Sequence, residues 1–329
     1  MKRIISIIMA AVFTASLFTA CAEGTAESAS DDQISIVTTI FPEYDWVMNV
    51  LGDNPSGAEV TMLLDDGVDL HSFQPTVDDI LKISSCDLFI YVGGESDGWV
   101  EDALAEATNS DMIVINLLDV LGDSVMEEEI VEGMQGEEEE ECEDEEEIEY
   151  DEHVWLSLRN AAVITESIGQ ALQTIDPDNA DLYQANAASY IDELRSLDDQ
   201  YQQVVDASEA DTLLFGDRFP FRYLTDDYGL DYYAAFAGCS AETEASFETI
   251  TFLASKVDEL GLNAILTIEG TDHSIASTIL ENTATGDQQI LTMDSMQSTT
   301  AEDVSNGASY LDIMRSNLEV LEQALQQEA

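Results

Sequence analysis

Positive charge is the scarcest feature of this sequence. Nine lysines and arginines stand against 70 aspartates and glutamates, and the formal net charge is −61. Nucleic acids and anionic lipid surfaces are held chiefly through Lys and Arg, so we expect no binding to DNA or RNA. The natural partners of such a chain are cations and basic surfaces.

Cysteine is also scarce, with four residues in the whole chain. If Cys21 carries a lipid, three cysteines remain, and an odd number of cysteines provides no disulfide framework. At most one bridge is possible, and whether Cys86 and Cys239 pair stays open. Both are expected to be buried apolar thiols and not ligands. Cys142 lies among acidic residues, which should raise its pKa and lower its reactivity.

Several signatures of catalysis are absent. The sequence has no His-Glu-x-x-His helix, no Gly-x-Ser-x-Gly turn, no phosphate-binding loop and no EF-hand loop. A catalytic zinc also needs an open coordination position and a general base. The chain is therefore not expected to be an enzyme. A zinc-dependent hydrolase is the alternative from a different class, and an acidic calcium-binding surface protein is a second one.

The N-terminus has the pattern of a secretory signal. Met1-Lys2-Arg3 is followed by an almost wholly apolar run over residues 4–18, which is too short to span a bilayer comfortably. Thr19-Ala20 then precedes Cys21, as in a lipobox. We expect residues 1–20 to be a signal peptide, Cys21 to carry a lipid and residues 21–33 to be a tether. The protein would then sit on the extracellular face of a bacterial cytoplasmic membrane.

The rest of the chain alternates between two periodicities. Runs rich in β-branched residues predict strands at 34–40, 60–64, 88–92, 112–117, 212–215, 232–236, 264–268 and 290–293. Helical spacing predicts helices at 44–51, 77–83, 160–172, 179–207, 221–228, 247–260, 274–282 and 310–327. The residues at helical spacing within 179–207 are Tyr183, Ala187, Tyr190, Ile191, Leu194, Leu197 and Tyr201. This order predicts the α/β class: two α/β lobes with parallel sheets, residues 34–178 and 208–329, joined by a long rigid helix over 179–207.

An acidic insert interrupts the first lobe at residues 127–152, where 17 of 26 residues are Asp or Glu. Like charges at this density repel, so the segment is expected to be disordered without counter-ions. It either collects cations loosely for a nearby site or only keeps the protein in solution.

Only three histidines occur, His71, His153 and His273. Imidazole is the side chain that transition metals prefer over bulk carboxylate. His71 lies in a loop between a predicted strand and a predicted helix, and His153 follows the acidic insert. Loops at the carboxyl ends of parallel strands form the binding crevice of an open sheet, so both histidines could lie there.

Several motifs together resemble one family. They are Phe-Pro-Glu-Tyr-Asp-Trp at 41–46, Gly-Val-Asp-Leu-His-Ser-Phe-Gln-Pro-Thr at 67–76, the run at 86–94 followed by Trp99, Asp-Glu-His-Val-Trp-Leu at 151–156, and the aromatic run at 221–230. In combination they resemble the metal-receptor lipoproteins of bacterial ABC uptake transporters, the zinc-uptake solute-binding proteins. Leu70 and Glu152 stand where that family has proline. The resemblance covers nearly all of residues 34–327.

The resemblance implies a four-ligand metal site with His71, His153 and Asp294. The family's third ligand position falls on Arg218, whose guanidinium stays protonated and cannot bind a metal. We predict that a one-residue bulge brings the neighbouring Asp217 into the site instead. Alternatives for this ligand are Glu242, Glu244 and Glu269, and then Asp272 or His273.

This ligand set favours zinc, with manganese as the alternative, because two imidazoles suit either ion and carboxylate oxygens suit manganese better. The resemblance implies an extracellular solute-binding protein that captures the ion between two lobes and delivers it to an ABC transporter permease. We expect a monomer that is held at the membrane by its lipid anchor.

The first prediction concerns this anchor. Replacing Cys21 with Ser should move the protein from the membrane fraction to the soluble fraction, because no thiol is left to carry the lipid. Fractionation and blotting of cells expressing either form would measure this. Retention of Cys21→Ser in the membrane fraction would place the anchor elsewhere in the chain.

Overall fold

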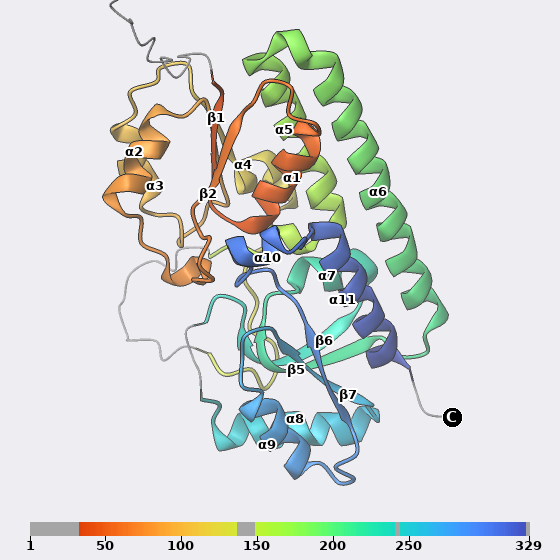
Figure 1. Cartoon of the computed structure of the whole chain (residues 1–329). Coiled ribbons are helices and arrows are strands. Elements are labelled where there is room, and N and C mark those ends of the chain that lie inside the picture. The colour runs from red at the N-terminus through yellow and green to blue at the C-terminus, as the bar shows by residue number, and fades with distance from the viewer. Residues whose placement is uncertain (1–32, 137–148, 241–243, 327–329) are drawn as a thin grey trace, which may run out of the picture. The chain divides into compact units, whose positions relative to one another are not determined.

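Two four-stranded parallel sheets organise the chain (Figure 1). The computed structural model describes residues 33–136, 149–240 and 244–326. The expected signal peptide, nearly all of the tether with Cys21, and also Cys142 and Glu242 lie outside these residues. Within residues 34–329, the described parts form one compact unit.

The two sheets have the same strand order. In the first sheet the order is β2-β1-β3-β4, and the strands are β1 (Ser35–Thr38), β2 (Glu59–Met62), β3 (Leu88–Tyr91) and β4 (Ile113–Asn116). In the second it is β6-β5-β7-β8, with β5 (Thr212–Phe219), β6 (Asp231–Ala237), β7 (Ala264–Ile268) and β8 (Gln289–Met293). Every strand pair is parallel, as predicted. The predicted fold of two parallel α/β lobes is confirmed.

Helices fill the connections, as parallel strands require. The first lobe contains α1 (Phe41–Leu51), η1 (Leu70–Ser72), α2 (Val77–Ser85), α3 (Val100–Ala105), α4 (Leu117–Leu121), η2 (Gly122–Ser124), η3 (Val154–Leu156) and α5 (Leu158–Ile175). η4 (Pro177–Asn179) leads into α6 (Ala180–Ala207). The second lobe contains α7 (Arg222–Tyr228), α8 (Phe247–Leu260), α9 (Ser274–Asn282), α10 (Ala301–Ser305) and α11 (Tyr310–Leu325).

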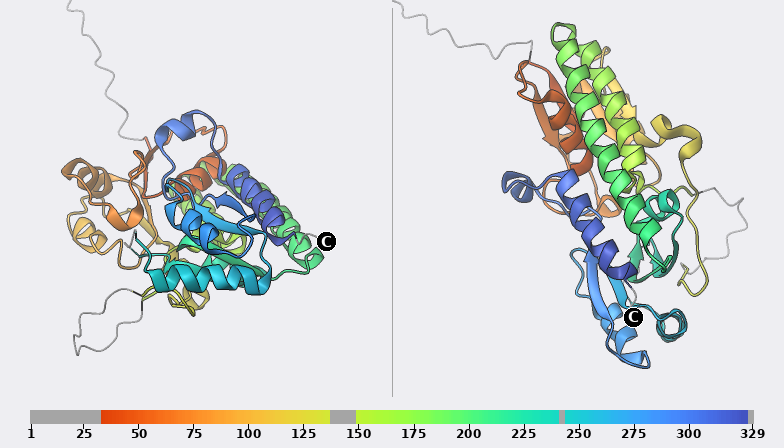
Figure 2. Two further views of the ribbon diagram at one scale, coloured as in Figure 1. Left: turned by 90° about the horizontal axis from the view of Figure 1, so that it is seen from below. Right: turned by 90° about the vertical axis from the view of Figure 1, so that its right-hand side faces the viewer.

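Helix α6 runs along one side of both lobes, as the green ribbon of Figure 1 and the right-hand view of Figure 2 show. Its 28 residues correspond to about 42 Å at 1.5 Å per residue. It packs on α1 and α5 of the first lobe and on α7 and α11 of the second. The buried side chains are the seven that helical spacing predicted: Tyr183, Ala187, Tyr190, Ile191, Leu194, Leu197 and Tyr201.

A single hydrophobic core extends from the first lobe into the second, and a smaller one lies beneath α8 and α9. Trp155 is fully buried in the large core, and its indole N–H donates to the carbonyl of Ser295 at 2.8 Å. The hydroxyl of Tyr310 in turn donates to the carbonyl of Trp155 at 2.6 Å. These buried polar contacts tie the second-lobe loop and α11 to the segment that carries His153.

The two ends of the acidic insert differ from expectation. Residues 127–136 and 149–152 are ordered: Glu127 pairs with Tyr150 in an antiparallel bridge, and Gln135 forms a bridge to Phe236 of β6. The prediction of disorder is wrong for these ends because backbone pairing compensates for the repulsion between carboxylates. Residues 137–148 lie outside the described part.

None of the helices in the described part is both long and apolar enough to cross a membrane.

Helix α6 generates a stability prediction. Leu194→Ala should lower the free energy of unfolding by about 2–5 kcal/mol, because the deletion leaves a cavity in a fully buried site. Glu193→Ala, at the exposed neighbouring position, should stay within about 0.5 kcal/mol of the parent. Denaturant unfolding of the three proteins measures both values. Equal effects would mean that α6 is not packed as described.

Candidate metal centre

His71 is presented by the loop that follows β2. Asp69 caps the short helix η1 by accepting the backbone N–H of His71 on Oδ1 at 3.0 Å, and Leu70 is buried beneath it. The Nδ1 atom of His71 lies 2.7 Å from the hydroxyl of Ser96. Because Nδ1 is occupied by this bond, Nε2 is the ring atom that remains for a ligand.

His153 is fully buried and is held by its own loop. The Oδ1 atom of Asp151 accepts both its backbone N–H, at 2.8 Å, and its Nδ1, at 3.0 Å. Tyr223 of α7 donates to the backbone carbonyl of Asp151 at 2.7 Å. A carboxylate on Nδ1 fixes the tautomer that leaves Nε2 free to accept, which is how metal-binding histidines are usually oriented.

The two imidazoles face each other. Their Nε2 atoms are 3.2 Å apart, and the ring centroids are separated by 5.2 Å. Two nitrogens bound to one tetrahedral zinc ion at 2.0–2.1 Å lie about 3.3 Å apart. The pair is therefore already spaced for a shared ion.

Cys239 lies beside this pair. Its Sγ and one nitrogen of each imidazole all lie within 4.8 Å of one another, and this is the group of three potential metal ligands found among the described residues. Cys86 and Cys239 are both free thiols. Cys86 is buried as predicted, whereas Cys239 is only partly buried, so the prediction of a buried thiol is wrong for Cys239. Burial and the nearby carboxylates of Asp151 and Glu128 raise the pKa of the Cys239 thiol well above its ordinary value.

The histidine pair holds protons unequally. Burial and the charge that His153 carries when protonated lower the pKa of His71 to about 4. Burial also acts to lower the pKa of His153, but the charge and hydrogen bond of Asp151 outweigh it, and the pKa is raised. The pair therefore accepts one proton readily, at His153, and a second, at His71, only near pH 4.

Glu152 lies against the Nδ1 side of the His71 ring. Its Oε1 accepts the backbone N–H of Ser96 at 2.9 Å, while Oε2 lies 3.5 Å from Nδ1 of His71 and has no hydrogen-bond partner within the described residues. Burial raises the pKa of this carboxyl. A Cβ at Gly94, whose φ is +83°, would come within 2.3 Å of Oε1, so this approach needs glycine.

Arg218 stands at the position that the resemblance gives to the third ligand, and it forms an ion pair. Its guanidinium lies 2.8 Å from Oδ2 of Asp69. The arginine lies in β5 and the aspartate in the His71 loop, so this pair joins the two lobes. The guanidinium outweighs the effect of burial and lowers the pKa of Asp69.

Asp217 lies within β5, and the predicted strand end at 215 is wrong by four residues because the chain continues pairing with β6 to Phe219. The register shifts between Phe215 and Arg218, so the expected irregularity is present. The carboxylate, however, accepts the N–H of Arg218 at 2.9 Å and the hydroxyl of Thr271 at 2.9 Å. It does not belong to the converging group of ligand atoms.

Asp294 directly follows β8, as predicted, but it also lies outside that group. Its Oδ1 accepts the N–H of Met296 at 2.8 Å. Burial and repulsion from Glu269 raise the pKa of Asp294 to about 6. The Glu269 carboxylate is itself bound by the backbone N–H and the hydroxyl of Ser295, at 2.6 and 2.7 Å.

A cavity of about 710 Å³ opens onto His71 and Cys239. Asp217, Glu244 and His273 also line it. The backbone of His273 lies in the left-handed region, with φ +56°, at the N-terminal end of α9. A second cavity of about 260 Å³ also shares His71 and Cys239 and includes Glu152.

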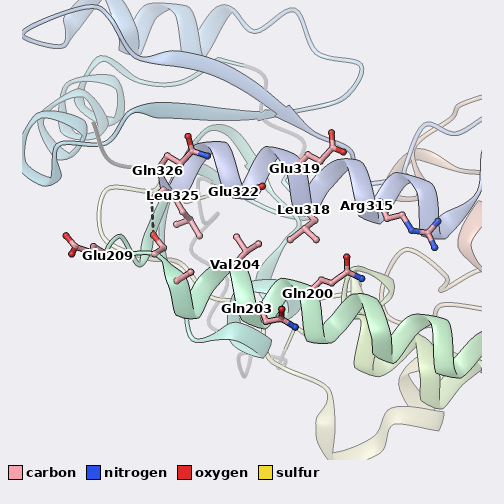
Figure 3. A pocket seen from close by; sticks show the side chains of 12 residues that line it. Gln200, Gln203, Val204, Glu209, Arg315, Leu318, Glu319, Glu322, Leu325 and Gln326 are labelled. Atoms are coloured by element: carbon pink, nitrogen blue, oxygen red, sulfur yellow. Dashed lines mark hydrogen bonds between the residues drawn. The ribbon is translucent and has the colours of Figure 1, made fainter. Parts of the chain in front are cut away.

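Another cavity of about 710 Å³ lies between α6 and α11, and it shares no lining residue with the cavities at His71 (Figure 3). Its lining is mixed, with Val204, Leu318 and Leu325 beside exposed polar residues. The carbonyl of Leu325 accepts the hydroxyl of Ser208 at 2.9 Å across one end. None of the described residues that line it is a histidine or a cysteine.

Cys239 is the residue that the sequence analysis missed. It follows β6 by two residues, on the same edge of a parallel sheet as Asp217 and Asp294. The rule that placed His71 at a strand's carboxyl end applies equally to Cys239. The signal was therefore present, although the residue type by itself favours a buried apolar thiol.

Comparison with known proteins gives consistent results. The profile of a family described as ZnuA, zinc-uptake complex component A, periplasmic, matches residues 36–324. The zinc-binding protein AdcA of Streptococcus pyogenes is 27% identical over 296 residues, which are 89% of this chain and 56% of AdcA. The chain thus spans little more than half the length of that relative. The high-affinity zinc uptake system protein ZnuA of Bacillus subtilis is 27% identical and is covered to 94%, as is this chain.

Among solved structures, the Zn(II)-bound ZnuA-like domain of Streptococcus pneumoniae AdcA is similar with a TM-score of 0.69 and 27% identity, over 90% of this chain and all of that one. The match of the profile extends from the first strand to the last helix. The chain therefore belongs to the family of zinc-uptake complex component A.

Proposed function

We propose that this protein captures a zinc ion between its two lobes and delivers it to an ABC transporter permease. His71 and His153 bind the ion through Nε2. The observation that carries the proposal is the 3.2 Å separation of these two atoms, each ring being held at Nδ1 by a partner of its own. The relatives AdcA and ZnuA are a zinc-binding protein and a zinc uptake protein by name, which supports zinc over manganese.

The side chains around the two imidazoles favour binding of a cation over catalysis by a bound cation. Asp151 and Glu152 border the imidazoles with acidic side chains and lie deep in the fold. A hydrolase would need a base positioned against an open coordination site, and the proposed role needs only binding and release. We therefore propose a receptor without catalytic activity. It acts as a monomer, and a lipid on Cys21 holds it on the extracellular face of the membrane.

Asp217 and Asp294 stay predicted ligands. Each carboxylate accepts hydrogen bonds from its own lobe, so each would have to give up these bonds to reach an ion at the imidazoles. Asp217→Asn and Asp294→Asn would report whether either does so, since an amide keeps the shape of the side chain but loses its charge.

Histidine variants test the site directly. His71→Ala and His153→Ala should each weaken zinc binding by roughly a hundredfold or more, because loss even of a partner that only orients a ligand costs 10–100-fold. His273→Ala is the matched control: it lines the same cavity but lies outside the converging group, and its effect should be small. Isothermal titration measures all three.

The His273→Ala control distinguishes the two ways in which this account could be wrong. Unchanged affinity in both His71→Ala and His153→Ala would end this account of the site. A large loss confined to His273→Ala would mean that the ion binds at the other side of the cavity.

Proton competition gives a further prediction. Protonated imidazole cannot bind zinc, so affinity should fall as the pH is lowered. The pKa of His153 is raised above its ordinary 6.5, whereas that of His71 is about 4. As the pH falls through the raised pKa of His153, the slope of log affinity against pH should therefore increase by about one proton, and a second proton, on His71, should compete only near pH 4. Titrations at half-unit intervals would show it, and a two-proton increase would mean that His71 also titrates there.

A further inference from the structure

We propose that Cys239 is a third ligand of the captured ion and binds it as a thiolate. The proposal rests on the function proposed above and names a residue of the same site. Three donor atoms converge there, since Sγ of Cys239 and a nitrogen of each imidazole lie within 4.8 Å of one another. Tetrahedral zinc with Zn–N near 2.05 Å and Zn–S near 2.3 Å would need N···S separations of about 3.5 Å. A shift of about 1 Å closes that gap.

The backbone around Cys239 is fixed against the histidine loop. Gly238 packs on the ring of His153, and a Cβ there would lie 2.9 Å from Cε1 of that ring and 2.9 Å from the carbonyl oxygen of Phe219. The N–H of Cys239 donates to Oε1 of Glu128 at 3.2 Å. The strand β6 therefore delivers the thiol to the imidazoles with its main chain held on both sides.

Arg218 explains why another donor is needed. It occupies the position of the third ligand in the resemblance, but it is paired with Asp69 at 2.8 Å and cannot coordinate. Cys239 enters from the next strand of the same sheet, because β5 and β6 are neighbours. The thiol is therefore the alternative to Asp217 for the coordination position that the arginine leaves vacant, and it is the one of the two that lies with the imidazoles.

A thiolate changes which ion the site prefers. Soft sulfur ligands favour zinc, whereas manganese favours oxygen. A donor set of two nitrogens and one sulfur should therefore bind zinc far more tightly than manganese, even though this chain lacks a third histidine at the site. On binding, the S–H bond breaks, a sulfur–metal bond forms and the proton passes to solvent.

Cobalt(II) provides the test, because thiolate–cobalt bonds give a near-ultraviolet charge-transfer band that imidazole and carboxylate do not. The full chain with cobalt(II) alone should show this band, and Cys239→Ser should lose it. Zinc affinity of Cys239→Ser should fall by roughly tenfold or more, and manganese affinity by less. Cys86→Ala and Cys142→Ser are matched controls that should keep the band and both affinities.

The outcomes are distinguishable. Tight zinc binding that depends on His71 and His153, without the band in the unaltered chain, would overturn the role of Cys239 and leave the proposed function standing. Absence of tight zinc binding in the unaltered chain would overturn the proposed function itself. Thermal unfolding of the metal-free variants establishes that a lost band reflects a lost ligand and not an unfolded protein.

Discussion

The approach of two imidazole nitrogens to 3.2 Å imposes a condition on everything around them, because both rings cannot be protonated at that distance in a buried site. The surrounding groups meet this condition by raising the pKa of one ring and lowering that of the other. Asp151 holds the first proton on His153, and burial together with the charge of that protonated ring keeps His71 uncharged. A dication between the Nε2 atoms would replace that single proton, and the carboxylate of Asp151, hydrogen-bonded to His153, would offset only part of its charge.

This geometry depends on the way the lobes are joined. His71 comes from the first sheet, Cys239 from the second, and His153 from the segment between the acidic insert and α5. A shared hydrophobic core and the buried contacts of Trp155 with the second lobe hold these segments together. Helix α6 packs on both lobes along their side, which limits the freedom of one lobe relative to the other. Loops that differ widely in sequence position therefore meet within a few ångströms.

Much of this architecture follows from periodicity alone. The apolar spacing of α6 identified all seven of its buried residues, and both parallel sheets follow from alternating strand and helix patterns. The convergence of His71 and His153 was predicted from their loops and from the resemblance. What periodicity does not encode is the direction of a side chain at a strand's end. Asp217 lies inside β5 with its carboxylate bonded to neighbouring donors, while Cys239, two residues past β6, turns toward the imidazoles.

The charge of Arg218 limits which donors can complete the site. A guanidinium beside a metal site repels the incoming dication, and Asp69 offsets that repulsion because their charges pair at 2.8 Å. Asp69 then no longer contributes net negative charge to the ion, and its other oxygen is used to cap the His71 loop. Two neutral imidazoles cannot supply the missing charge. An anionic donor in direct contact with the ion would supply it, and the thiol of Cys239 is the one donor of the converging group, among the described residues, that can become anionic.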